Sequence, residues 1–415
     1  MKKAVLVSVL MLMICVFAFS AGQSDQESKG PIVLRVFWNP SHLYEPYQRV
    51  FQEFEAEKNV KIQLEQYRWD ELRQKLVASF VAGDPPDMSE DASDAIKYGK
   101  LGYLAPINEF ESPEFFKDWQ DSSMKRNSSD GNIWALQIHL TGIGVYANET
   151  LLKNAGLNEV PGNWDDFLAA AKKTTDTENG VYGFVSNKDV WWTYPWILQA
   201  GAELYDTENK KMTINTPEFV KAWTFLQDLI HRHKVAPRPD QAVAGYEGPS
   251  NLFKAGRAAM ILDGPWSYTP IEKAGPEFEW CVAEPFSNKT QRTASGGSGV
   301  IIPKGDNQEL AWELLKRLVD VEVEVEISKK NLMTMPRRSW AKNAEVMSDP
   351  VLNVFAKTVA VSYELRTPFM AMGTHKQIQD IIQTAHDRII LGAEDSQTVL
   401  DEANLKCEEL LKEFK

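Results

Sequence analysis

The amino-acid sequence predicts an α/β fold in which strands and helices alternate around parallel sheets. Apolar runs typical of buried strands alternate with segments whose apolar residues recur at helical spacing. The chain has 415 residues, of which 43% are hydrophobic and 25% charged. That length suits two or three domains, whose cores would need neither disulfides nor a metal. The chain has no internal repeat of fixed period.

The first elements follow this alternating order. Residues 32–38 form a nearly continuous apolar run, predicted as a strand buried on both faces. Apolar residues at helical spacing over 47–54 predict the first helix. Apolar and polar residues then alternate over 60–64 as a second strand. A second helical stripe over 72–80 ends at Gly83 and the Pro-Pro break behind it.

Later segments repeat the pattern. A strand is predicted over 143–147, followed by a helix over 148–155. Asn163 is placed to cap the next helix, and 181–185 reads as another strand. From residue 311 onward the chain is predicted to be mostly helical, with helices that cover the sheets or wrap the outside.

Composition narrows the classes of partner. The chain holds 45 basic and 58 acidic residues, a formal net charge of −13. Binding to nucleic acid or to an anionic membrane needs a basic surface, so neither is expected. The predicted partner is small and neutral or cationic. The 13 tryptophans suit stacking on sugar rings or cations, although tryptophan is often simply core.

The N-terminus has the layout of a secretory signal peptide. Two lysines precede an apolar run over 4–19, and small residues follow at 20–22. Residues 1–21 are therefore predicted to be a signal peptide cleaved near residue 20, which places the protein in the periplasm or otherwise outside the cytoplasm. A lipid anchor is not expected, because Ile14 rather than a small residue precedes Cys15.

Enzyme motifs are missing from the sequence. It contains no P-loop, HExxH, GxSxG or paired CxxC. His231 and His233 lie two apart on a predicted helix and cannot share a metal. The glycines of SGGSG at 295–299 precede a strand, which suits a backbone crossing rather than a dinucleotide site. Neither cofactor nor metal is expected. Whether Cys281 and Cys407 pair is left open.

Two kinds of segment could bind a ligand. The acidic loop PPDMSEDASD at 85–94 could direct carboxylates at hydroxyls or a cation, or could simply be solvated. DVWWTYPW at 189–196 carries more aromatic surface than one face can bury, so part of it is predicted to line a cleft. MILDGPWS at 260–267 places Trp266 beyond a Gly-Pro turn, where an exposed ring can stack on a ligand.

The order and spacing of six motifs resemble a known family. The motifs are DGNIWALQ (130–137), IGVYANETLLKNAGL (143–157), NWDDFLAAAKK (163–173), NLFKAGRAAMILDGPW (251–266), SGGSGVIIPK (295–304) and AWELLKRLVD (311–320). Together they closely resemble the extracellular solute-binding proteins of ATP-binding-cassette sugar importers, the group that includes maltodextrin-binding protein. The resemblance spans nearly the whole mature chain.

That resemblance implies a two-lobed α/β clamp of the periplasmic-binding-protein kind, type II-like, with the ligand in a cleft between the lobes. The chain would cross between lobes more than once. Together with the interrupted α/β order and the glycine-rich crossing, this places 31–140 and 298–345 in an N-terminal lobe. Residues 143–294 and 348–415 are placed in a C-terminal lobe.

The resemblance also implies a ligand site. It puts carboxylates of the acidic loop on sugar hydroxyls, an acidic and aromatic platform at 189–194, and the family's stacking tryptophan at Trp266. A maltodextrin binder has an aromatic where Asp91 stands and another near His375, so a long glucan is not implied. The predicted ligand-binding residues are Trp38, Asn39, His42, Glu90, Asp91, Asp94, Thr141, Asp189, Trp191, Trp192, Tyr194, Asp263, Trp266, Gly296, Gly297, Arg338 and His375.

The predicted function is carbohydrate binding for transport, without catalysis. A monomer would capture a mono- or oligosaccharide and deliver it to the membrane permease subunits of an ATP-binding-cassette importer. Two alternatives stay open. Clustered Asp and Trp also suit a polyamine or similar cation bound by the same fold. A secreted glycosidase would likewise show aromatics and paired carboxylates.

Overall fold

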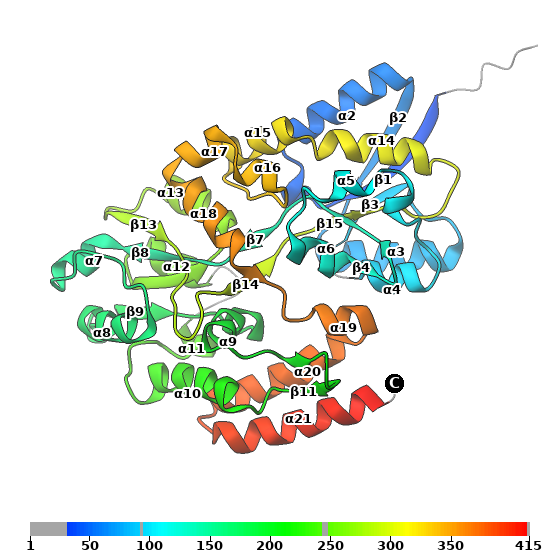
Figure 1. The fold of residues 1–415 in the computed structure, drawn as a ribbon. Helices are drawn as coiled ribbons and strands as arrows, with labels where there is room; N and C mark the ends of the chain where they lie inside the picture. The colour runs from blue at the N-terminus through cyan, green and yellow to red at the C-terminus, as the bar shows by residue number, and fades with distance from the viewer. Residues whose placement is uncertain (1–30, 92–93, 243–247, 413–415) are drawn as a thin grey trace, which may run out of the picture.

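Two β-sheets, each flanked by helices, divide the molecule into two lobes in the computed structural model (Figure 1). The structure describes residues 31–91, 94–242 and 248–412. The predicted signal peptide lies outside the described residues. Within the described ranges, no helix combines the length and the apolar character that a membrane span requires.

The sheet of the first lobe has the strand order β2-β1-β3-β15-β6. Its first three strands are parallel, as predicted, while β15 runs antiparallel to both β3 and β6. Asn59, in the left-handed conformation at φ 51°, ends the helix between the first two strands. The strands are β1 (Ile32–Trp38), β2 (Val60–Gln66), β3 (Met88–Asp91), β6 (Leu136–Gln137) and β15 (Gly299–Ile301), and the helices between them are α2 (Glu45–Lys58) and α3 (Trp69–Ala82).

The sheet of the second lobe has the order β13-β8-β12-β9. The side chain of Asn163 accepts a hydrogen bond from the backbone N–H of Asp166 and caps α8, as predicted. The strands are β8 (Gly144–Asn148), β9 (Tyr182–Val185), β12 (Ala258–Asp263) and β13 (Trp280–Ala283), and the main helices are α7 (Glu149–Asn154), α8 (Trp164–Thr174), α9 (Tyr194–Ala200), α10 (Pro217–His231) and α12 (Gly248–Lys254).

Three short strands connect the lobes. β7 (Thr141–Gly142), β14 (Thr293–Gly296) and β16 (Ser362–Tyr363) form a sheet in the order β16-β14-β7. The position directly after β14, Gly297, requires glycine. Gly297 has φ +117°, and a Cβ there would lie 2.0 Å from the carbonyl oxygen of His139. The crossing predicted at 295–299 therefore lies between the lobes.

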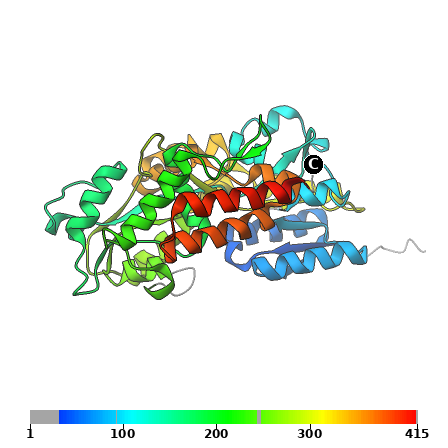
Figure 2. The same ribbon diagram turned by 90° about the horizontal axis from the view of Figure 1, so that it is seen from below.

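The C-terminal part of the chain is mostly helical. α14 (Gln308–Leu318) and α15 (Val321–Asn331) pack on α2 of the first lobe. α20 (His375–His386) and α21 (Ser396–Lys412) pack on each other, and α21 also packs on α10; in Figure 2 the red α21 lies beside the green helices of the second lobe. These helices cover the outside of the lobes.

Two helices that follow the predicted boundary at residue 348 contact both lobes. α18 (Pro350–Ala360) buries Leu352 in the apolar core of the first lobe and Phe355 in a cluster of the second. α19 (Thr367–Met372) contacts α4 (Ala95–Lys100) and α6 (Asp121–Asn127) of the first lobe, while its Phe369 lies in the core of the second. Because their faces bury residues of both lobes, these helices join the lobes and do not belong to one.

The remaining elements are short helices, turns and strands, and η1, η3 and η4 among them carry residues that line the cavity described below. Cys281 in β13 and Cys407 in α21 are both free thiols. The elements are η1 (Pro40–His42), α4 (Ala95–Lys100), η2 (Ile107–Glu109), α5 (Pro113–Phe116), α6 (Asp121–Asn127), β4 (Ser128–Ser129), β5 (Asn132–Ile133), η3 (Val190–Thr193), β10 (Tyr205–Asp206), β11 (Lys211–Met212), α11 (Pro239–Ala242), η4 (Pro265–Ser267), α13 (Tyr268–Ala274), α16 (Arg338–Ala341), α17 (Ala344–Ser348) and the π turn η5 (Asp387–Leu391).

Candidate functional site

A cavity of about 620 Å³ is lined by residues of both lobes and of the strands that join them. This volume falls in the range of small-molecule sites. The lining residues are Ser41, His42, Tyr44, Trp69, Arg73, Arg126, His139, Thr141, Asp189, Trp191, Trp192, Trp266, Gly296, Gly297, Met333, Arg366 and Gln379.

Part of the predicted ligand set lines this cavity. These residues come from segments far apart in the chain, which the lobe crossings bring together. They are His42, Thr141, Asp189, Trp191, Trp192, Trp266, Gly296 and Gly297.

Other predicted residues do not line the cavity. Trp38 and Tyr194 are fully buried, and Trp38 packs edge-on against Tyr47 and Phe51. Both rings belong to the lobe cores, since β1 and α9 turn these side chains inward.

Two more predicted residues serve the local backbone. Asn39 Oδ1 accepts the backbone N–H of Ser41 at 2.9 Å and caps η1. Asp263 Oδ1 accepts the N–H of Gly264 at 2.8 Å, at the turn that follows β12. Their polar atoms hold the turns that carry His42 and Trp266, both of which reach the cavity.

Asp91 and Asp94 of the acidic segment do not line the cavity. Asp94 pairs with Arg73 at 2.9 Å, and His375 Nε2 lies 3.9 Å from the same carboxylate. Asp91 is buried and accepts the N–H groups of Asp94 and Ala95. Arg338 does not line the cavity and instead pairs with Asp121 at 2.7 Å.

The aromatic wall is built from two short turns. Asp189 Oδ1 accepts the N–H of Trp191 at 2.8 Å and so begins η3, which carries Trp191 and Trp192. Trp266 comes from η4, with its ring centroid 6.5 Å from Trp191 and 6.3 Å from Trp192. Trp266 is half-buried, so part of its ring is available to a ligand.

Gly264 sets the position of the Trp266 ring. A Cβ on Gly264 would lie 2.3 Å from ring atoms of Trp266, and the Gly264 carbonyl accepts the Tyr146 hydroxyl at 2.6 Å. Because the carbonyl is held, the added methyl group must displace the ring.

We expect Gly264→Ala to weaken ligand binding about 10-fold, a loss within the 1–3 kcal/mol range of an aromatic stacking contact. Isothermal titration calorimetry measures it. The matched control is Gly305→Ala, where a Cβ would meet nothing within 4 Å. Equal affinity of the two variants would contradict the placement of the ring.

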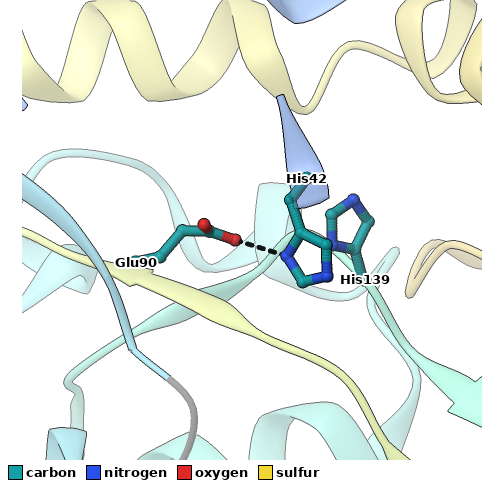
Figure 3. Close-up of side chains that lie close together, drawn as sticks. All are labelled: His42, Glu90 and His139. Carbon is teal, nitrogen blue, oxygen red and sulfur yellow. Dashed lines mark hydrogen bonds and ion pairs between the residues drawn. The ribbon is translucent and has the colours of Figure 1, made fainter. Parts of the chain in front are cut away.

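A hydrogen-bonded network supports His42 at the cavity. Glu90 is fully buried; its carboxylate accepts the N–H of Asn39 at 2.6 Å and the Ser298 hydroxyl at 3.1 Å. His42 Nδ1 lies 2.8 Å from Glu90 Oε1 (Figure 3). The bond to Glu90 leaves the other ring edge of His42 for a ligand.

His139 completes the network. Its Nδ1 lies 3.2 Å from Ser298 Oγ and its Nε2 3.4 Å from the Tyr47 hydroxyl. Burial, together with the nearby His42, lowers the pKa of His139 well below its ordinary value. The ligand atoms of His42, Glu90 and His139 lie within 4.8 Å of one another, close enough to share a metal ion. The hydrogen bonds account for the arrangement without one.

Three arginines form the polar wall, and sequence reasoning missed all of them. Arg126 Nη1 lies 3.4 Å from Glu364, and Arg366 Nη2 lies 2.7 Å from the same carboxylate. Arg73 could have been found from its place on a helix near the acidic loop. Arg126 and Arg366 stand in no motif, and only the fold brings them together. Tyr44, Trp69 and His139 were missed for the same reason.

Asp91 makes the folding stability of the protein depend on pH. Burial, and secondarily the charge of Asp94, raises its pKa to about 7. The folded state therefore favours the protonated carboxyl, and stability falls as pH rises from about 4, the pKa of an unfolded Asp, through 7.

We expect Asp91→Asn to remove the loss of folding stability that accompanies ionisation of Asp91. Its unfolding free energy should rise relative to that of the parent between about pH 4 and pH 7, by at most about 1.4 kcal/mol per pH unit. Urea unfolding at several pH values measures the difference. Exposed Asp306→Asn is the control. A gap between Asp91→Asn and the parent that does not change with pH would contradict the raised pKa.

Comparison with known proteins supports the fold and assigns the family. The maltotriose-binding protein of Pyrococcus abyssi is 23% identical and covers 82% of this chain and 74% of its own length. The diacetylchitobiose binding protein DasA of Streptomyces coelicolor is 23% identical over 67% of each chain. The GacH receptor of Streptomyces glaucescens, crystallised unliganded and with acarbose, has a TM-score of 0.79 at 22% identity, covering 92% of this chain and 100% of its own.

The predicted two-lobed α/β fold is thereby confirmed. A family model described as bacterial extracellular solute-binding protein matches residues 40–323. Because that match spans more than half of the sequence, the chain belongs to the bacterial extracellular solute-binding protein family.

Proposed function

We propose that the protein is an extracytoplasmic carbohydrate-binding protein that delivers a mono- or oligosaccharide to an ATP-binding-cassette permease. The observation that carries this proposal is that one cavity is lined by both aromatic and polar side chains. Trp191, Trp192 and Trp266 face it together with arginine and histidine side chains. Indole rings suit the apolar faces of a sugar, and the polar groups suit its hydroxyls. Relatives named for maltotriose and diacetylchitobiose support the same ligand class.

Binding would proceed by closure of the lobes around the sugar. Three short strands and the shared helices α18 and α19 join the lobes, which suits a hinge. Trp266 packs against the apolar cores of both lobes, so its ring lies between the two lobes that would close around the sugar. The sugar would be buried between the indoles and the arginines, and the permease would recognise the closed form.

A polyamine suits the cavity poorly. Its charged lining among the described residues comprises Arg73, Arg126 and Arg366 against the carboxylate of Asp189. Guanidinium groups repel a polycation at close range. This alternative from the sequence is therefore not retained.

Hydrolysis is not expected either. Asp91 and Asp94, the carboxylates that a glycosidase would use, lie outside the cavity lining. Asp91 accepts backbone N–H groups and Asp94 pairs with Arg73. We propose that a bound oligosaccharide is carried unchanged by a secreted monomer whose residues 1–21 have been removed.

A thermal-shift screen of the chain without residues 1–21 tests this function. The probes are common mono-, di- and trisaccharides, with spermidine and short peptides as other classes. At 100 times its Kd, a bound saccharide stabilises the folded state by about 2.7 kcal/mol and raises Tm. A Tm raised by spermidine or peptides and by no saccharide would contradict the proposal. So would the release of reducing ends from a bound oligosaccharide.

A further inference from the structure

We propose that Gln383 is a positioning residue of the cavity, because its side-chain amide holds the start of η3. This turn carries Trp191 and Trp192, and Asp189 caps it. All three line the cavity, whereas Gln383, on α20, does not. Gln383 therefore acts on a ligand only through the turn. Its effect on sugar affinity rests on the proposed function, whereas its effect on the position of the turn does not.

Two hydrogen bonds join the Gln383 side chain to the backbone on either side of Asp189. Gln383 Oε1 accepts the N–H of Val190 at 2.8 Å, and Nε2 donates to the carbonyl oxygen of Lys188 at 3.1 Å. These two groups belong to the peptide planes before and after Asp189. Because a residue turns only about the two dihedral angles between its peptide planes, the amide of Gln383 restricts the backbone of Asp189.

The buried start of η3 needs such a partner. The first N–H groups of a helical turn have no acceptor inside the turn. The carboxylate of Asp189 accepts the N–H of Trp191 at 2.8 Å, and Gln383 accepts that of Val190. Val190 is fully buried, so water does not reach its N–H group. Loss of the Gln383 amide leaves that group unsatisfied, and we expect the turn to move until water can reach it.

The Gln383 amide is itself held in one orientation. Its Nε2 also donates to Asp387 Oδ1 at 2.8 Å, and the same carboxylate oxygen lies 2.9 Å from Nδ1 of buried His386. An amide nitrogen has two hydrogens, which here have a carbonyl and a carboxylate as acceptors. The opposite orientation would turn Oε1 toward two acceptors. The oxygen of the amide is therefore the atom that faces Val190.

Fluorine NMR tests the position of the turn without any sugar. The chain without residues 1–21 is labelled with 5-fluorotryptophan, and Trp191→Phe and Trp192→Phe assign two resonances by their loss. We expect Gln383→Met to shift or broaden both, because the turn loses its hydrogen bonds to α20. The resonance of Trp340, in the core of the first lobe, is assigned in the same way and should not change.

The matched control is Gln397→Met, the same substitution at an exposed glutamine of α21. The amide of Gln397 also donates to a backbone carbonyl, that of Asn215, and does not line the cavity. This variant should leave the two η3 resonances as they are in the parent. If Gln383→Met does not fold by circular dichroism, Gln383→Asn decides, because its amide is one methylene too short to reach Val190. Unchanged η3 resonances in a folded Gln383 variant would overturn the proposal.

Sugar affinity is the second measurement. Glucose, galactose, maltotriose and diacetylchitobiose are titrated into the parent and the variants by calorimetry. We expect Gln383→Met to weaken the binding of any sugar that the parent binds by about 10-fold, since side chains that are no longer held must be ordered on binding.

The outcomes separate this proposal from the proposed function. A sugar that binds Gln383→Met as tightly as the parent would overturn the positioning role and leave carbohydrate binding standing. If none of the four sugars binds the parent, that result counts against the proposed function, and the NMR comparison decides whether Gln383 positions the turn.

Discussion

Trp266→Ala is expected to weaken saccharide binding about 10- to 100-fold. The half-buried ring lies at the cavity beside Trp191 and Trp192, and its loss removes a stacking surface worth about 1–3 kcal/mol by analogy with stacked bases. Calorimetric titration of the parent and the variant with the saccharide found in the thermal-shift screen measures the change. An unchanged affinity would place the sugar elsewhere.

The same variant should also lose some stability without ligand. The sequence predicts a ring outside the core, but Trp266 packs against the apolar cores of both lobes. The loss should stay below the 3–5 kcal/mol typical of a fully buried tryptophan such as Trp196. Trp280→Ala is the matched control. Trp280 is half-buried, stacks on Tyr146 and does not line the cavity, so its removal should lower stability and spare binding.

Glu364→Gln is expected to lower the unfolding free energy by about 3–5 kcal/mol. The carboxylate is buried between Arg126 and Arg366, and its removal leaves two guanidinium groups without their shared charge. Urea unfolding followed by circular dichroism measures the loss.

The control for this variant is Glu345→Gln. Glu345 is 58% exposed and pairs with Lys329, a surface contact worth at most about 1 kcal/mol. If Glu364→Gln were as stable as Glu345→Gln, the buried guanidinium groups of Arg126 and Arg366 would not depend on this carboxylate.

Local patterns predicted much of the fold. The strand at 32–38, the helix over 47–54 and the cap at Asn163 each depend on neighbouring residues, and the structure has all three. The same patterns did not reveal α18, since a helix that buries apolar residues in two lobes has the same periodicity as one that serves a single core.

The site was less accessible to sequence reasoning. The clustered aromatic residues pointed to Trp191 and Trp266, which line the cavity. The cluster does not show which of its rings packs into the core, and Tyr194 is one that does. Arg126 and Arg366 are 240 positions apart in the chain and meet only through the lobe crossings. The net charge of −13 does not predict the local charge of a cavity whose lining includes three arginines.

A crystal structure of the chain without residues 1–21, grown with the saccharide that raises its Tm most, tests the sugar-binding cleft most directly. We expect the sugar in the cavity between the lobes, with one ring face on Trp266 and polar contacts to Arg126, Arg366 or His42. A sugar bound outside this cavity, or inside it without contact to Trp266, would contradict the proposed site.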